Sequence, residues 1–174
     1  MKDQIENALA FCNPVKAQVF DKDGNLKFET ECFNGIVDEG IHNLLEVTFD
    51  GVVNAPETAW YIGLMAASPT LDPGDTAAQI GGSNGWTEFT AYSAPVTRPD
   101  WTAVVGVPAT RAITNATTLD FTISGGSSTV SGIFVVSSNV ISGTSGVLFA
   151  TAEFASAATV TGGDTLKVTY TVSG

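Results

Sequence analysis

The last third of the chain holds apolar segments of strand length, separated by short turns rich in glycine and serine. Leu119–Ile123 alternates apolar and polar residues with a period of two, as a half-buried β-strand does. Further segments of this kind follow at 130–136, 147–154 and 166–172. Because strands spaced in this way, with no helix between them, are typical of an antiparallel β-sandwich or jelly roll, the sequence predicts an all-β fold.

The first third predicts three further elements. Residues 1–14 end in the turn signal Asn13-Pro14, and we interpret them as an N-terminal arm. Two β-type runs then flank the Asp-Gly of residues 21–25, which predicts a hairpin because glycine supplies the positive φ that the turn needs. One short helix is predicted at about 35–49, capped by Asn34. Its apolar stripe, which is expected to face the core, follows a period of 3.6 residues and comprises Val37, Ile41, Leu44, Leu45 and Thr48. Residues 15–174 therefore form one predicted β-sandwich domain.

The middle of the chain combines one buried strand with long loops. Residues 59–65 form a near-continuous apolar run, which predicts a strand buried on both faces. Residues 66–86 are rich in proline and glycine, and residues 93–102 contain two prolines. Both stretches are predicted to be irregular, while residues 86–90 alternate as a strand does. Loops of such length are a frequent place for function or for an interface.

Charge and composition exclude several functions. Only 14% of the residues are charged, against about 25% in a typical chain, and serine, threonine and glycine supply the polarity. The net charge of −11 and the scattered basic residues disfavour direct nucleic-acid binding. No apolar stretch is long enough for a membrane helix, and the N-terminus does not resemble a secretory signal. Cys12 and Cys32 could pair, but a reducing cytoplasm favours free thiols.

No residue pattern indicates catalysis, a cofactor or a metal. The single histidine, His42, is expected on the solvated face of the helix, and no nucleophile elbow occurs. A paired-carboxylate glycosidase using Glu88 or Asp100 is the enzyme alternative. Residues 21–25 suggest a calcium loop, but their glycine is out of place for an EF-hand, so a hairpin turn is the better interpretation. The chain is therefore predicted not to be an enzyme.

A set of short phrases gives the chain a resemblance to a known group of proteins. The phrases are Trp60–Leu64, Gly74–Thr76, Gly85–Glu88, Thr97–Pro99, Ile133–Ser137, Gly146–Ala150 and Gly162–Leu166. With them, the sequence from about residue 17 to residue 174 resembles small phage virion structural proteins, similar to head cement or decoration proteins. The resemblance implies a virion location after assembly in the host cytoplasm.

This resemblance implies that the protein stabilises the head as a capsid cement, bridging subunits of the major capsid protein. Self-association as a dimer or trimer is expected, with the arm of residues 1–14 ordering on its partner. A tail or neck component, or a carbohydrate-binding receptor-recognition module, is the alternative. Trp86, Tyr92, Arg98 and Trp101 are the predicted interface anchors, because aromatic residues and arginine are the usual hot spots. The competing interpretation places the tryptophans in the core.

Overall fold

Strands make up most of the molecule. The computed structural model describes residues 13–50, 57, 59–66, 70–81, 87–105 and 112–173. The helical elements are α2 (Asp38–Leu45), the π-helical turn η1 (Glu46–Asp50) and the 3-10 turn η2 (Ala77–Ile80). The strands are β1 (Asn13–Phe20), β2 (Leu26–Ile36), β3 (Tyr61–Met65), β4 (Tyr92–Ala94), β5 (Ala103–Val105), β6 (Ala112–Asn115), β7 (Leu119–Ile123), β8 (Ser128–Val136), β9 (Leu148–Val160) and β10 (Thr165–Ser173).

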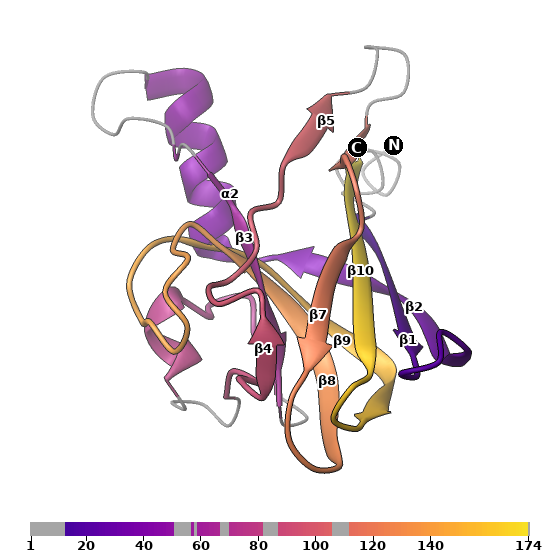
Figure 1. The fold of residues 1–174 in the computed structure, drawn as a ribbon. Coiled ribbons are helices and arrows are strands. Elements are labelled where there is room, and N and C mark those ends of the chain that lie inside the picture. The colour runs from indigo at the N-terminus through magenta and orange to yellow at the C-terminus, as the bar shows by residue number, and fades with distance from the viewer. Residues whose placement is uncertain are drawn as a thin grey trace.

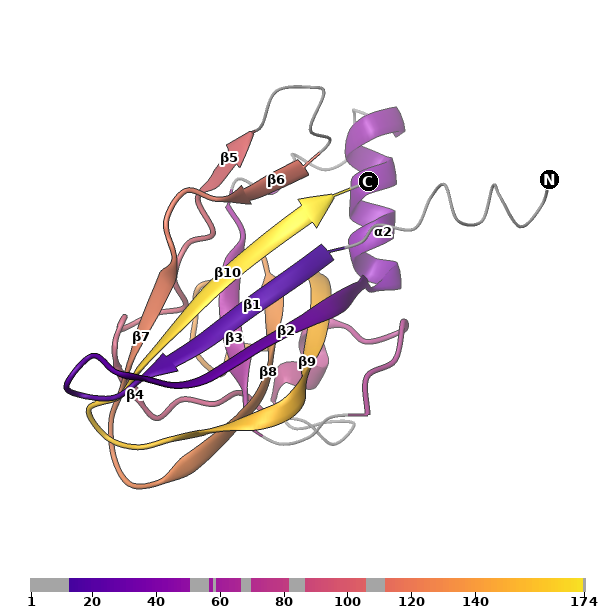
Figure 2. The same ribbon diagram turned by 90° about the vertical axis from the view of Figure 1, so that its right-hand side faces the viewer.

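The described strands join in one antiparallel sheet that curls around its core. The strand order is β3-β8-β9-β2-β1-β10-β6-β5, and β7 pairs with both β10 and β4. In Figure 2, β2, β1 and β10 lie in front of β3, β8 and β9, so two parts of the same sheet face each other. The predicted all-β class is confirmed, as are the strands of the last third of the chain.

The first two strands form the predicted hairpin. Gly24 has a φ of +85° in the turn, which explains why glycine is needed there. β1 begins at Asn13, which pairs with Asn34, and Pro14 pairs with Phe33. The last two residues of the predicted arm therefore belong to the sheet. Residues 1–12 lie outside the described residues.

Strand β8 is buried on both faces, and this gives the molecule two apolar clusters. Ile133 and Val135 point into the main core between the two parts of the sheet. Phe134 points to the other face, where η2 and Leu71 cover a smaller cluster. The Phe134 ring lies so close to Gly63 that a Cβ on Gly63 would be 2.1 Å from it. The predicted burial of the 59–65 run on both faces thus holds for β3.

The helix is shorter than predicted and starts later. Residues 35–36 extend β2 because Gly35 and Ile36 pair with Thr151 and Ala150 of β9. The residue before α2 is Val37, so the prediction that Asn34 caps the helix is wrong. The Asn34 amide instead donates a hydrogen bond to the Tyr170 hydroxyl in the core.

Two further regions differ from the predictions. Residues 93–102, predicted to be irregular, include part of β4, which pairs with β7. The predicted strand at 86–90 appears, within its described residues, only as single bridges from Thr87 to Gly81 and from Glu88 to Met65. No helix in the described part of the chain has the length and apolarity needed to cross a membrane.

Candidate interface surface

The base of α2 is fixed tightly to the sheet. A Cβ on Gly40 would lie 2.3 Å from the Phe149 carbonyl oxygen, so the helix packs against β9 at a distance that only glycine allows. The Glu39 carboxylate accepts hydrogen bonds from the backbone N–H groups of Leu148 (2.7 Å) and Ala77 (3.2 Å). Glu39 therefore links α2 to β9 and η2.

Beyond this base, the helix exposes apolar side chains. The predicted core-facing stripe contributes Val37 to the core and Leu44 partly, but Ile41 and Leu45 are exposed, Leu45 by 52%. The end of α2 rises above the sheet in Figure 1, where no described strand covers it. We define the α2 apolar surface as Ile41, Leu45, Val47 and Phe49, of which Phe49 is 82% exposed. Ile41, Leu45 and Phe49 follow one another at intervals of four residues, and exposed apolar side chains near one another are typical of interaction sites.

A second apolar feature lies where β2 meets β9. Phe33 is 69% exposed and stands at the edge of a groove of about 310 Å³. We call it the Gly35 groove, and its apolar lining includes Phe33, Ile36, Val37, Leu71 and Pro73. Two acidic residues, Asp72 and Glu153, also line it. No sequence prediction covered this site. One signal was present, because Phe33 lies on the same face of the strand as Glu29 and Glu31, and a side chain on a polar face is expected to be exposed.

Arg98, one of the predicted anchors, lies inside the molecule at 1% exposure. Its guanidinium donates to both oxygens of Glu88, over 2.8 and 2.9 Å. It also donates to the carbonyl oxygens of Ser138 and Gly143, and it lies 5.1 Å from the centre of the Phe134 ring. The Glu88 carboxylate further accepts a hydrogen bond from the Ser142 N–H. This ion pair therefore ties the 138–143 loop to the body of the protein.

Tyr92 and Trp101 are also buried. The Tyr92 ring contacts Phe121 edge-on, at 5.1 Å between centres, and burial, with the nearby Glu88 charge, raises its pKa to about 12. The Trp101 indole N–H donates to the Tyr170 carbonyl oxygen at 3.2 Å. The structure thus places Tyr92, Arg98 and Trp101 inside the molecule, and for Trp101 this position favours the core interpretation. Trp86 lies outside the described residues.

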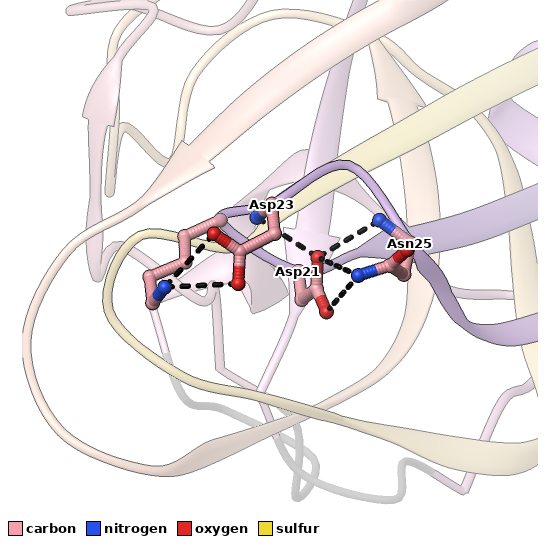
Figure 3. Close-up of polar contacts among 4 residues, drawn as sticks. Asp21, Asp23 and Asn25 are labelled. Carbon is pink, nitrogen blue, oxygen red and sulfur yellow. Dashed lines mark hydrogen bonds and ion pairs between the residues drawn. The ribbon is translucent and has the colours of Figure 1, made fainter.

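The Asp21–Asn25 turn has the contacts of a hairpin turn (Figure 3). The Asp21 carboxylate accepts hydrogen bonds from the backbone N–H groups of Asp23 and Asn25 and from the Asn25 side chain. These hydrogen bonds lower the pKa of Asp21. The Asp23 carboxylate pairs with Lys22. Within the described ranges, no group of three or more acidic, histidine or cysteine side chains could hold a metal ion.

The histidine, the cysteines and two further aspartates have separate surroundings. His42 is exposed, as predicted, and lies 3.1 Å from Glu46. Asp100 bridges to Tyr61 through its backbone, and Asp164 pairs with Lys27 at 2.5 Å. Cys32 is a buried free thiol whose pKa burial raises to about 11, while Cys12 lies outside the described residues.

Comparison with known proteins gives one family. Residues 37–172 match the family described as Gp80, the podophage GP4 fiber I protein gp80. The match begins at α2 and reaches β10, so it includes the α2 apolar surface and most of the sheet. No curated protein matches the sequence. Because the match spans most of the chain, the protein belongs to the podophage fiber I protein family, a family of phage structural proteins.

Proposed function

We propose that the protein is a fiber- or tail-associated structural component of a phage virion that works by binding other proteins, without turnover of a substrate. The family match over residues 37–172 carries this proposal, because the family is described as a fiber protein. The match favours the tail or neck alternative over the expected capsid cement. The cement role, with the major capsid protein as partner, is not confirmed.

The surface features support a role in assembly. The α2 apolar surface and Phe33 expose large apolar side chains that a neighbouring protein would bury, and the fixed base of α2 holds its part of that surface rigidly. Self-association as a dimer or trimer, as closed symmetry favours, is part of the proposal. The virion is the proposed location.

Glycan recognition is less well supported. Exposed tryptophan rings would favour it, but Trp101 is buried and Trp60 packs against Phe149 with 5.1 Å between ring centres. Trp86, the third tryptophan, lies outside the described residues.

Immunogold electron microscopy of intact virions tests the proposal. An antibody against the protein is expected to label the tail, its fibers or the neck. Label spread over the whole head surface would contradict the proposal and restore the capsid cement. Absence of label on virions that contain the tail proteins would contradict any structural role in the virion.

A further inference from the structure

The Gly35 groove has a floor without a side chain. Along β2, the outward positions alternate with the buried residues Cys32 and Asn34, so Gly35 faces the same side as Phe33. A Cβ built on Gly35 meets no atom within 4 Å. Space over Gly35 is therefore open, and Phe33 and Leu71 border it with apolar surface. A side chain entering this space would gain apolar contact along its stem.

The charge of the groove is one-sided. Asp72 and Glu153 line it, and no lysine or arginine among the described residues does. Neither carboxylate has an ion-pair partner among the described residues. A cation placed between them would add attraction to the apolar contact, and truncating one member of such a pair would be costly.

The described part of a second copy of the chain offers no unpaired basic side chain to such a site. The basic residues in the described part of the chain are already ion-paired with acidic ones: Lys16, Lys22, Lys27, Arg98 and Lys167. Charge complementarity therefore favours a different protein with a basic contact surface.

We propose that the Gly35 groove docks a lysine- or arginine-bearing segment of another virion protein, with the aliphatic stem over Gly35 and the cation between Asp72 and Glu153. This inference rests on the proposed function, since it takes the protein to be a virion component. It adds the chemistry of the partner and the place where that partner binds.

The test replaces the gene in the phage with variants and measures copies of the protein per purified virion by quantitative mass spectrometry. Gly35→Leu places a side chain in the groove, at a position where the added Cβ meets no atom within 4 Å, and Glu153→Lys reverses one of its charges. Gly126→Leu is the matched control for the first, because a Cβ there also meets nothing within 4 Å. Asp23→Lys, an exposed charge reversal in the β1–β2 turn, is the control for the second.

Both groove variants are expected to lower the copies per virion at least tenfold, while both controls stay near wild type. Thermal melts of the purified variants separate loss of docking from loss of folding, and Glu153→Lys changes only an exposed side chain. Wild-type loading of both groove variants would overturn the proposal. If only Gly35→Leu lowers the copies per virion, the groove docks a partner without a cation between the two acidic residues, and the proposed basic chemistry of the partner is wrong.

Two other occupants of the groove, a segment of the same chain and a second copy of the chain, are tested with the isolated protein. Carbodiimide couples a carboxylate to a lysine in contact with it, and the expected result is no link from Asp72 or Glu153. A link to Lys2 of the same chain, or to a second copy, would identify the occupant as the protein itself and overturn the inference. The protein could instead be found on the head, with the groove variants still lowering its copies per virion. That result would contradict only the proposed function.

Discussion

Replacing Arg98 by methionine tests whether the buried ion pair stabilises the fold. The variant keeps a long side chain beside Phe134 but removes the donors to Glu88, Ser138 and Gly143. Among the described residues, the Glu88 carboxylate, 1% exposed, would then keep only the Ser142 N–H as a donor. Breaking a buried pair by removing one partner costs about 3–5 kcal/mol. For a chain of this length, that corresponds to a fall in Tm of about 6–20 °C.

Circular dichroism melts and urea unfolding of the purified protein measure this loss. Lys167→Met is the matched control, because it removes a lysine paired with Asp120 at a position where both side chains are a third or more exposed. The control is expected to cost less than about 1 kcal/mol, as surface pairs do. An Arg98→Met loss no larger than that of the control would refute the reasoning, since the pair would then contribute no more than a surface contact.

Three further outcomes follow from the packing. Gly40→Ala is expected to lower the free energy of unfolding by about 1–3 kcal/mol in urea melts, because its methyl group would overlap the Phe149 carbonyl oxygen; an unchanged midpoint would contradict the tight helix–sheet contact. Since burial raises the pKa of Tyr92 to about 12 from an ordinary value of 10.0, the folded state holds this proton more tightly. Stability is therefore expected to fall as pH rises from 10 to 12, and less so in Tyr92→Phe. Cys32, with its pKa raised to about 11, is expected to react with a thiol reagent at pH 8 only after urea unfolding; rapid labelling of the native protein at Cys32 would contradict its burial.

The sequence predicts strands well where their two faces differ or where turns mark their ends. Leu119–Ile123 alternates in the sequence and in burial, so β7 lies where the pattern placed it. The β1–β2 hairpin follows from its Asp-Gly turn. β5 and β6 were not predicted, because they are only three and four residues long and owe their form to pairing with each other and with β10.

The helix and the interface depend on tertiary contacts that the sequence does not display. A period of 3.6 residues identifies an apolar stripe but gives no information on how far the sheet extends beneath it, so Ile41 and Leu45 were expected in the core. Arg98 and Tyr92 lie in loop-like sequence, which suggested exposure. Their partners Glu88 and Phe121 arrive from other segments, and only the fold brings them together.

Quantitative mass spectrometry of separated heads and tails from disrupted virions tests the proposed function most directly. The account predicts that the protein leaves with the tails or their fibers, in a fixed ratio to the other tail proteins. Retention on tailless heads, in a ratio to the major capsid protein that matches its lattice sites, would contradict the fiber- or tail-associated role and would show a capsid cement instead.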